Sequence, residues 1–516
     1  MLDKKTVFQI FALVLLLIWY GLFFANKVDL TVVDLGRHLE NGQMVLQGNF
    51  DVLKTNFYSY TQPDYPVVNH HWLSGVIFFL IWHVFGFAGL SLFYLVISLI
   101  IFYIFFRLAQ KQSSFKIAFF VSILLIPLIA SRAEIRPEIF SYFFISIFFW
   151  ILWHHRQGLL SFKYLFILPV LGILWVNTHI YFIFGLFLIG LFLFEKIVKK
   201  LFIHRSISFY KDKQIKNLGI VFFLTAIVSC INPFGLKGVL YPFNIFRSYG
   251  YRIIENQSVW FLENLGFIRN PNLLLFKIVF FVLLLSFILV LIRKRKSFSL
   301  IYFSLAVLFS VMAWTAIRNF TLFGFFALLI IAFNIKNVLE KEIKLKSFNF
   351  RIFIVFIGLA IFLISIFTHN TRLPFEQGEF GFGLKKNNSK SAEFFKKENI
   401  QGSIFNNYDI GGYLIFYFYP DESVFVDNRP EAYSVPFFKE IYIPIQDDNS
   451  IWNEQDKIYD FNAIFFSHRD ATPWAQKFLN ERINDSLWAP VFVDEYSIIF
   501  LKRNNLNQAI IDKYGF

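Results

Sequence analysis

The sequence predicts a polytopic α-helical membrane protein with a small α/β domain near its C-terminus. The first observation is composition: 57% of the 516 residues are hydrophobic and only 16% are charged. The second is that apolar runs of about 20 residues recur, each long enough to cross a hydrocarbon layer ~30 Å thick. The third is a shift in charge, because residues 369–516 carry a net charge of −6, whereas the first 368 residues carry +20.

About eleven membrane spans are expected. The first follows Lys4 and Lys5 and lacks a small-residue cleavage site, so we expect a retained helix rather than a signal peptide. The apolar segment 72–85 is short and stops at Gly86, and counting it would reverse every later segment. It is expected to be an interfacial or re-entrant helix. The expected spans are 7–25, 87–106, 116–131, 138–154, 163–176, 180–196, 217–231, 272–292, 298–314, 319–336 and 351–368.

The distribution of Lys and Arg predicts the orientation. With a cytoplasmic N-terminus, the inner loops hold 23 Lys and Arg, whereas the outer segments between spans hold 10 over a greater length. The basic loop 196–216 and the "RKRK" at 293–296 both fall inside, as the positive-inside rule requires. This basic charge sets topology and can contact anionic lipid, so it does not indicate nucleic-acid binding. The inner loops are 1–6, 107–116, 155–163, 196–216, 293–296 and 336–351.

Residues 369–516 are expected to form an extracytoplasmic α/β domain, with the boundary near His369. The preceding domain, 1–368, includes a long first outer loop, 26–72. Within the C-terminal domain, probable helices alternate with probable strands. The only cysteine, Cys230, excludes an intramolecular disulfide framework and a cysteine-based metal cluster. A helix is expected at 391–399, and strands at 402–407, 423–428, 462–468 and 496–503.

Acids, amides, histidines and arginines gather in the outer loops. "VVDLGRHLENG" (32–42) and "NHHW" (69–72) share the first loop, and "SRAEIRPEIF" (131–140) is the sharpest charge cluster. Ionisable residues beside a membrane are costly, and they tend to be functional or paired. The cluster therefore suggests an external site, against the alternative of cap ion pairs and interfacial anchors. The candidates are Asp34, His38, Asn69, His70, His71, Arg132, Glu134, Arg136, Glu138, Asn177, His179 and Arg318.

This mixture of side chains suits group transfer from a lipid phosphate. A carboxylate acts as general base on an acceptor hydroxyl, and arginines bind the leaving phosphate, where negative charge develops. Attack opposite the leaving group inverts the anomeric centre. A donor that arrives as a lipid needs no nucleotide-binding loop, and the sequence contains no P-loop and no G-x-G-x-x-G stretch.

At this point the residues resemble a known family, the GT-C superfamily of polyprenyl-phosphate-sugar-dependent glycosyltransferases. More closely, the chain resembles bacterial integral membrane proteins of that superfamily with D-x-G-x-H-x-x-x-G, then "FSYT", then H-x-W-L. These patterns read here Asp34, Gly36, His38 and Gly42, then "FYSYT" and "HHWL". The resemblance covers most of the chain, and it continues in "RPEIFSY" (136–142), "WVNTH" (175–179), "NPFGL" (232–236), "RNF" (318–320), "NNYDIGGYL" (406–414) and "VFVDNRPEAY" (424–433).

The resemblance implies a GT-C-like fold and an inverting glycosyltransferase of the bacterial cytoplasmic (inner) membrane. It would transfer a sugar from a polyprenyl-phosphate donor to a cell-envelope glycan, lipid or protein on the outer face. Asp34 would be the catalytic base or the acid that orients the acceptor. Where the family often has a second acid, this sequence has His71. No metal ligand is therefore assigned, and a requirement for a divalent metal, Mg or Mn, stays open.

The remaining candidates have roles that the sequence leaves open. His38 follows Asp34 by one helical turn and either positions a substrate hydroxyl or forms a local salt bridge. His70 and His71 contact phosphate, or His70 is structural. Arg132 and Arg136 share a helix face, as do Glu134 and Glu138, so the acids hold the arginines for phosphate binding. Arg318 is a third cation, Asn177 and His179 are candidates for sugar contacts, and Trp175 and Tyr181 are expected in the interfacial belt.

Two other functions compete with glycosyl transfer. A transporter or flippase for a lipid-linked glycan would carry polar residues near the middle of its spans, yet most spans here are Phe, Leu and Ile. A non-catalytic relative that binds a lipid glycan would tolerate the loss of Asp34. In the C-terminal domain, Asp427 and Arg429 either bind a glycan or, as we expect, form a structural ion pair.

Overall fold

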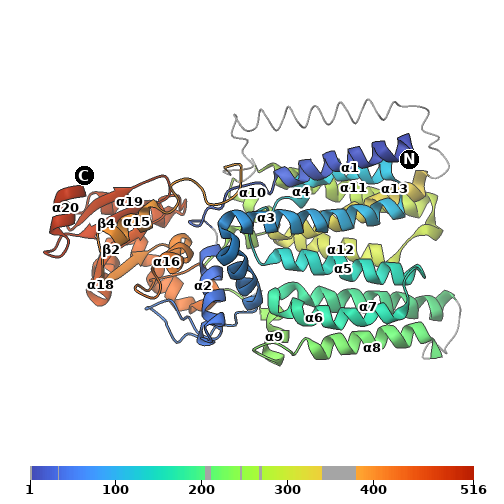
Figure 1. Cartoon of the computed structure of the whole chain (residues 1–516), viewed down its shortest axis with the longest axis horizontal. Coiled ribbons are helices and arrows are strands. Elements are labelled where there is room, and N and C mark those ends of the chain that lie inside the picture. The colour runs from blue at the N-terminus through green and yellow to red at the C-terminus, as the bar shows by residue number, and fades with distance from the viewer. Residues whose placement is uncertain (1–2, 33, 204–210, 245–246, 267–269, 340–378) are drawn as a thin grey trace.

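The computed structural model describes residues 3–32, 34–203, 211–244, 247–266, 270–339 and 379–516. These residues are mostly helical and form two parts, a bundle of long helices and an α/β unit built from residues 379–516 (Figure 1). The α/β unit lies beyond one end of the bundle. We name that end the domain-facing end and the other the opposite end.

Helices occur at the first ten of the predicted spans. The eleventh, 351–368, and the boundary near His369 lie outside the described residues. The bundle helices are α1 (Lys4–Leu22), α3 (Trp72–Gln112), α4 (Phe115–Ile129), α5 (Glu138–Arg156), α6 (Ile167–Thr178), α7 (Ile183–Val198), α8 (Lys213–Val228), α11 (Pro271–Arg293), α12 (Leu300–Thr315) and α13 (Phe320–Leu339). Two short helices, α9 (Leu236–Leu240) and α10 (Val259–Asn264), lie between α8 and α11.

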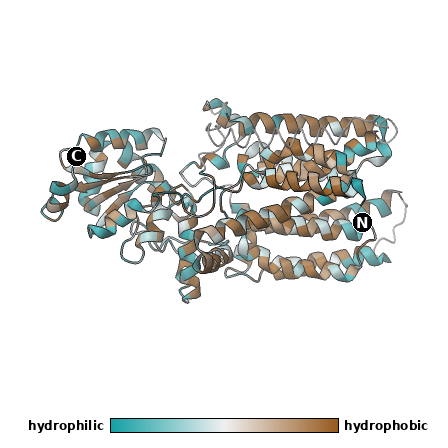
Figure 2. Cartoon of the chain, turned by 45° about the horizontal axis from the view of Figure 1, so that its top comes forward, coloured by the Kyte–Doolittle hydropathy of each residue, from teal (hydrophilic) through white to brown (hydrophobic). Residues whose placement is uncertain are grey.

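Five described helical segments are long and apolar enough to cross a membrane: 4–22, 72–112, 180–202, 271–293 and 317–339. Three shorter apolar segments accompany them, and hydrophobic residues dominate the bundle (Figure 2). Helix α13 is the most enclosed of the five, since it packs against α3, α4, α11 and α12. The bundle is that of an integral membrane protein.

Several bundle helices begin at a short polar side chain that caps their first turn. Asp3 accepts a hydrogen bond from the Thr6 backbone N–H at 2.7 Å, and Ser114 accepts one from Ile117 at 3.3 Å. Asn270 precedes Pro271 at the start of α11, where the missing N–H of proline costs nothing. Apolar periodicity thus places these helices, and isolated polar residues mark where they begin.

Helix α3 is broken at Gly86, as the sequence predicted. Its backbone there has φ 65° and ψ −170°, a conformation that glycine adopts readily and other residues rarely adopt. The segment before Gly86 packs along α2 (Leu35–Leu46) rather than continuing straight through the bundle (Figure 1). The break therefore frees one helical segment to support the first long loop.

The α/β unit is built on a four-stranded sheet in the order β1-β2-β4-β3. Strand β1 (Ser403–Asn406) is parallel to β2 (Phe461–Phe466), and β4 (Ile498–Lys502) is antiparallel to both β2 and β3 (Trp488–Val493). Strand β3 was not predicted, because Pro490 interrupts its pattern; a proline is tolerated on this edge strand. The accompanying helices are α15 (Lys390–Lys397), α16 (Gly411–Phe418), α17 (Pro444–Asp447), α18 (Asn449–Tyr459), α19 (Pro473–Ile483) and α20 (Gln508–Tyr514).

The predicted strand at 423–428 is wrong. Only Val424 forms a β-bridge, and its partner is Ser59 of the first long loop rather than a sheet strand. Side chains satisfy the neighbouring backbone groups: the Phe425 N–H donates to Asn406 Oδ1, and the Asp427 N–H donates to the Tyr433 hydroxyl, both at 2.9 Å. The apolar alternation of this segment reflects burial between the loop and the α/β unit.

Glycines let α2 approach its two neighbours closely. A Cβ atom on Gly36 would lie 2.5 Å from the backbone oxygen of Gly412 in α16. A Cβ atom on Gly42 would lie 2.3 Å from the backbone oxygen of Gly75 in α3. Both distances are too short for any other side chain, so these glycines fix α2 between the bundle and the α/β unit.

Candidate functional site

Asp34 occupies the N-cap position of α2 but does not cap the helix. Its side chain makes no bond to the backbone of the first turn. Instead its Oδ2 accepts hydrogen bonds from Arg37 Nη2 at 3.1 Å and from His38 Nε2 at 3.2 Å. Its Oδ1 is buried and has no hydrogen-bond partner among the described residues. A buried carboxylate oxygen without a donor is uncommon and indicates a group available to a ligand.

The surroundings of Asp34 keep it ionised. Burial alone would raise its pKa, but His38, Arg136 and Arg37 together lower the pKa well below its usual range. Burial also lowers the pKa of His38, against the attraction of Asp34. With its pKa lowered, His38 is a neutral donor through Nε2 at neutral pH, and its hydrogen bond together with the charges of Arg37 and Arg136 keeps Asp34 anionic.

Three histidines meet beside Asp34. The rings of His38 and His71 lie edge to face with centroids 4.8 Å apart, and His71 Nδ1 is 3.1 Å from His70 Nε2. Burial lowers the pKa of His70 to about 4, and it lowers the pKa of His71 well below the usual range. Neutral imidazoles bind phosphate or sugar as hydrogen-bond partners, and they add no positive charge.

Buried polar atoms without partners concentrate around this cluster. Arg37 is almost fully buried, yet its Nε and Nη1 have no acceptor among the described residues. The same holds for other buried atoms of the first long loop. They are His38 Nδ1, Asn41 Nδ2, Asn56 Nδ2, Asn69 Oδ1 and His71 Nε2.

The charged turn 131–137 forms a network with very different properties. Arg132 donates to both carboxylate oxygens of Glu138 at 3.1 Å, and it also pairs with Glu255. Arg136 donates to Glu134 at 2.9 Å and to Glu255 at 3.2 Å. The turn is not helical, so the prediction that residues four apart share a helix face is wrong, and Pro137 instead precedes the start of α5.

Arg318 joins the same network from the beginning of α13. It pairs with Glu138 and donates to Asn256 Oδ1 at 2.8 Å. Burial of Glu255 would raise its pKa, but Arg132 and Arg136 outweigh burial and lower the pKa to about 2. Three arginines thus face three glutamates, which leaves little of their charge for a phosphate.

Asn177 and His179 hold the bundle together. Asn177 Oδ1 accepts from Trp72 Nε1 at 2.8 Å, and its Nδ2 donates to the backbone oxygens of Ile173 and Ile231. His179 Nδ1 lies 2.8 Å from the Ser141 hydroxyl, which also accepts a bond from Trp175 Nε1.

The prediction that Trp175 and Tyr181 lie in an interfacial belt is wrong. Trp175 has no exposed surface, and Tyr181 is buried with its hydroxyl bonded to Asn319 Oδ1 at 2.8 Å. A belt residue would place its ring at the membrane surface. These rings pack within the bundle, where their polar atoms have hydrogen-bond partners.

The α/β unit completes the site. Gly412 lies against α2, so that a Cβ atom there would be 3.5 Å from the Asp34 Cα and 3.0 Å from Asn428 Oδ1. Asp427 and Arg429 form the expected ion pair, with Nε 2.9 Å from Oδ1, and Arg429 also donates to Asn56. The "DIGGYL" and "VFVDNR" stretches therefore adjoin Asp34, although almost 400 residues separate them in sequence.

Two residues of the site were not chosen from the sequence. Arg37 stands in "VVDLGRHLENG" (32–42) and Glu255 in the outer segment between the expected spans 217–231 and 272–292, yet neither was assigned a role. The sequence did not show that Arg37 is buried, because its position in an irregular hydrophobic pattern does not indicate that the side chain points inward. Glu255 could be recognised as the partner of Arg132 and Arg136 only once the loop was placed.

The residues around Asp34 do not fit a hard divalent cation such as Mg²⁺ or Mn²⁺. Such ions prefer several oxygen ligands, with carboxylates foremost. Asp34 offers one carboxylate, and Arg37 and His38 already hold its Oδ2. In the part of the chain that the structure describes, no three His, Cys, Asp or Glu side chains form a metal-binding group.

Comparison with solved structures identifies the fold. The oligosaccharyltransferase of Archaeoglobus fulgidus in its apo form matches 94% of this chain and 73% of its own, with a TM-score of 0.56 and 11% identity. ArnT from Cupriavidus metallidurans in the apo state matches 98% of this chain and 99% of its own, with a TM-score of 0.53 and 11% identity. Both are membrane proteins of the GT-C superfamily.

The chain has the GT-C fold. A third structure, the oligosaccharyltransferase AglB of Archaeoglobus fulgidus in complex with an inhibitory peptide and a dolichol-phosphate, matches 93% of this chain and 72% of its own. Its TM-score is 0.54, at 10% identity. No family model and no curated protein matches the sequence. The GT-C resemblance drawn from the sequence is thus confirmed at the level of fold.

Proposed function

We propose that the protein is an inverting glycosyltransferase that moves a sugar from a polyprenyl-phosphate donor to a cell-envelope glycan, lipid or protein. The observation that carries the proposal is Asp34, a partly buried carboxylate whose buried Oδ1 has no partner among the described residues, at the domain-facing end of a GT-C fold. The dolichol-phosphate bound to AglB supports a lipid phosphate as the class of donor. The function is a proposal because fold alone does not fix an activity.

Asp34 would act on the acceptor hydroxyl. Its Oδ1 accepts the hydroxyl proton while Arg37 and His38 hold Oδ2, so that one oxygen fixes the carboxylate and the other serves the substrate. The acceptor oxygen bonds to the anomeric carbon, the bond from that carbon to the phosphate oxygen breaks, and the phosphate leaves with the electron pair. The proton passes to Asp34 as the new bond forms.

The low pKa of Asp34 favours orientation over strong proton abstraction. A carboxylate with so low a pKa is a weak base towards an unreacted hydroxyl. The hydroxyl becomes acidic only as its oxygen bonds to the electron-poor anomeric carbon. The anionic carboxylate would also stabilise positive charge that develops on the sugar ring in the transition state.

Arg37 is the better candidate for binding the leaving phosphate. Arg132, Arg136 and Arg318 are paired with glutamates, and of their buried donors only Arg318 Nε has no acceptor among the described residues. Arg37 pairs with Asp34 through Nη2 but keeps two buried donors, Nε and Nη1, without acceptors among those residues. Two donors of one guanidinium group match two phosphate oxygens. This assignment moves phosphate binding from the predicted turn 131–137 to the helix that carries Asp34.

The charge bias supports an extracytoplasmic site. The predicted outer loops meet at the domain-facing end, where Trp72 contacts Asn177 and Arg318 contacts Glu138. The basic "RKRK" loop at 293–296 is at the opposite end, after α11. We therefore place the C-terminal α/β unit and Asp34 on the outer face of the cytoplasmic membrane, with the N-terminus cytoplasmic.

The test is sugar transfer from a panel of polyprenyl-phosphate sugars by the full chain in nanodiscs. We compare wild type, Asp34→Asn, and Asp64→Asn as a control, because Asp64 is an exposed acid in the same loop. Transfer by wild type and the control, with loss in a folded Asp34→Asn, supports the proposal. Equal transfer by all three removes Asp34 as the catalytic acid. Binding of a lipid-linked sugar without transfer in any protein favours a transporter or a non-catalytic glycan-binding relative.

A further inference from the structure

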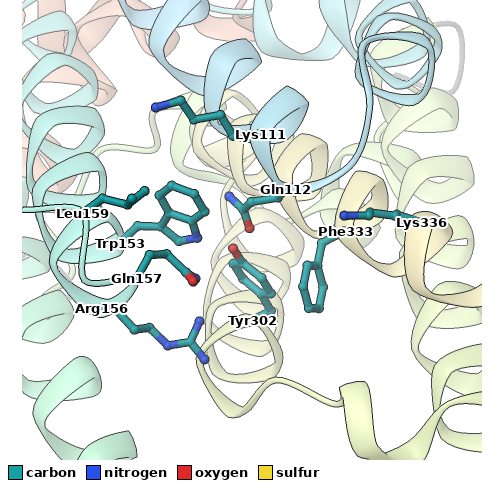
Figure 3. Close-up of a pocket in the computed structure, with 9 residues that line it drawn as sticks. All are labelled: Lys111, Gln112, Trp153, Arg156, Gln157, Leu159, Tyr302, Phe333 and Lys336. Atoms are coloured by element: carbon teal, nitrogen blue, oxygen red, sulfur yellow. The ribbon is translucent and has the colours of Figure 1, made fainter. Parts of the chain in front are cut away.

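A second polar site lies at the opposite end of the bundle, far from Asp34. A cavity of about 330 Å³ opens there between the ends of α3, α5 and α13 and the start of α12 (Figure 3). Its walls carry three cations, Lys111, Arg156 and Lys336, and no carboxylate among the described residues. A pocket of this size is ample for a phosphate with a few attached carbons.

The charge of this cavity is only partly compensated. Lys111 Nζ lies 2.9 Å from His154 Nε2, and His154 Nδ1 donates to the Trp150 backbone oxygen, so the imidazole faces Lys111 as an uncharged acceptor. Lys336 has no ion pair among the described residues, and Figure 3 shows its amine directed toward Gln112. The two lysines therefore leave a local excess of positive charge.

Arg156 contributes in a different way. Its Nε and Nη2 donate to the two oxygens of Glu195 at 2.8 and 2.7 Å, and Lys199 pairs with the same carboxylate at 3.0 Å. One glutamate thus faces two cations, which leaves this group positive as well. The pairing holds the guanidinium at the cavity wall in a fixed orientation.

Gln112 supplies an independent sign of a ligand. It is 7% exposed, and neither its Oε1 nor its Nε2 has a hydrogen-bond partner among the described residues. Its amide points into the cavity toward Tyr302 and Trp153 (Figure 3). An amide buried without partners costs free energy, and a bound polar group would recover that cost.

We propose that this cavity binds the phosphate headgroup of an anionic phospholipid. The cations attract the phosphate, the Gln112 amide donates to one of its oxygens, and Trp153, Leu159 and Phe333 offer apolar walls to the adjoining glycerol and acyl chains. Basic pockets between membrane helices bind anionic headgroups at the cytoplasmic side, which is the side the charge bias predicts for this end.

The test measures lipid retention rather than sugar transfer, so it is independent of the proposed activity. The full chain is purified in detergent, incubated with phosphatidylglycerol or phosphatidylcholine, and analysed by native mass spectrometry. Wild type is expected to retain phosphatidylglycerol in preference to phosphatidylcholine. Lys111→Gln and Lys336→Gln should each lower the affinity about fivefold. Lys163→Gln removes an exposed charge at the same end, outside the cavity, and should change nothing.

Gln112→Leu provides a second, independent readout. It removes the unpartnered amide, so it should weaken retention of phosphatidylglycerol while leaving the lipid-free melting temperature equal to or above that of wild type. Equal retention of both lipids by wild type, or unchanged retention in both lysine variants, would overturn the proposal. Displacement of the lipid by millimolar inorganic phosphate would identify a soluble phosphate as the ligand and overturn the lipid assignment.

Discussion

Two charged regions adjoin each other at the domain-facing end, and they differ in how completely their polar atoms are paired. Around Asp34, the carboxylate, Arg37, His38 and His71 all keep buried atoms without partners among the described residues. Around Glu138 and Glu255, three arginines share their donors among three glutamates, and only Arg318 Nε is buried without a partner among the described residues. Charge density therefore does not distinguish a binding site from a structural ion-pair network, whereas the number of buried polar atoms without partners does.

The paired network gives the unpaired region its position. It joins the start of α5, the start of α13 and the loop that contains Glu255, and it lies close enough for Arg136 to lower the pKa of Asp34. Breaking the network should therefore cost stability first. Breaking the region around Asp34 should cost activity first. Each of the following variants tests one side of that contrast.

The largest effect is expected from Arg37→Gln on sugar transfer. Removing a donor that stabilises the charge developing on the leaving phosphate should lower kcat/KM about 100- to 1000-fold. The melting temperature should fall less than in Glu138→Gln, because the substitution breaks the ion pair with Asp34 but also removes two unpaired buried donors. Arg252→Gln, at an exposed arginine, is the matched control in the same transfer assay. A large loss of stability together with unchanged transfer by the surviving protein would place Arg37 in the support instead.

Glu138→Gln should be the most destabilising change in the network. Glu138 is almost fully buried and pairs with both Arg132 and Arg318, so its loss leaves the Arg318 guanidinium without a charged partner among the described residues and Arg132 with Glu255 alone. The expected loss is about 3 kcal/mol in the free energy of unfolding. Glu134→Gln is the control, since Glu134 is half exposed and pairs only with Arg136. Equal melting temperatures for the two variants would contradict the assigned supporting role.

Glu40 tests the region around α2 through pH. Burial raises its pKa to about 7, from 4.5 in the unfolded chain, so the native state keeps it protonated while the unfolded state ionises. Its contribution to stability is complete below pH 4.5 and is lost as the pH rises through 7. Glu40→Gln should therefore stabilise the protein by about 1–3 kcal/mol at pH 8 and hardly at pH 4. Unfolding curves with the same pH dependence in both proteins would show that Glu40 is not buried.

Gly36→Ala should destabilise the protein less than Glu138→Gln does, but it should still affect Asp34. The added Cβ atom would meet the Gly412 backbone oxygen at 2.5 Å, so α2 and α16 must move apart. Overpacking of this kind costs about 1–3 kcal/mol, and here it displaces the residues on either side of Asp34. Gly219→Ala, in α8, is the control, because no atom lies within 4 Å of its Cβ position. Transfer rates equal in the two variants would mean that this contact does not position the site.

Much of this fold could be predicted from hydrophobic patterning. Runs of Phe, Leu and Ile place the helices, and Gly86 marks the break in α3 because only its backbone favours that conformation. The prediction of a strand at 423–428 failed because apolar alternation indicates burial. It does not distinguish a sheet strand from a loop that is buried against other side chains. Strand β3 was missed for the opposite reason, since Pro490 is acceptable at an edge.

The site could be predicted as a set of residues but not as a set of partners. Asp34 and His38 stand on one local pattern, and their contact is confirmed at 3.2 Å. Which arginine is paired depends on Glu255, which lies more than 100 residues from Arg132 and Arg136. Local sequence does not show such long-range pairs, so Arg37 was overlooked while arginines paired with glutamates were chosen.

The contacts between the first long loop and the α/β unit can form only late in synthesis, because they join segments that lie far apart in the chain. Asp29 bonds to Lys385, Asn388 and Arg469, partners 356, 359 and 440 residues later in the chain. The ribosome synthesises the loop that contains Asp34 early and the residues that bond to Asp29 late. Every bundle helix after α1 is made while that loop lacks these partners. The first long loop therefore gains the last of these three partners only once Arg469 has been synthesised.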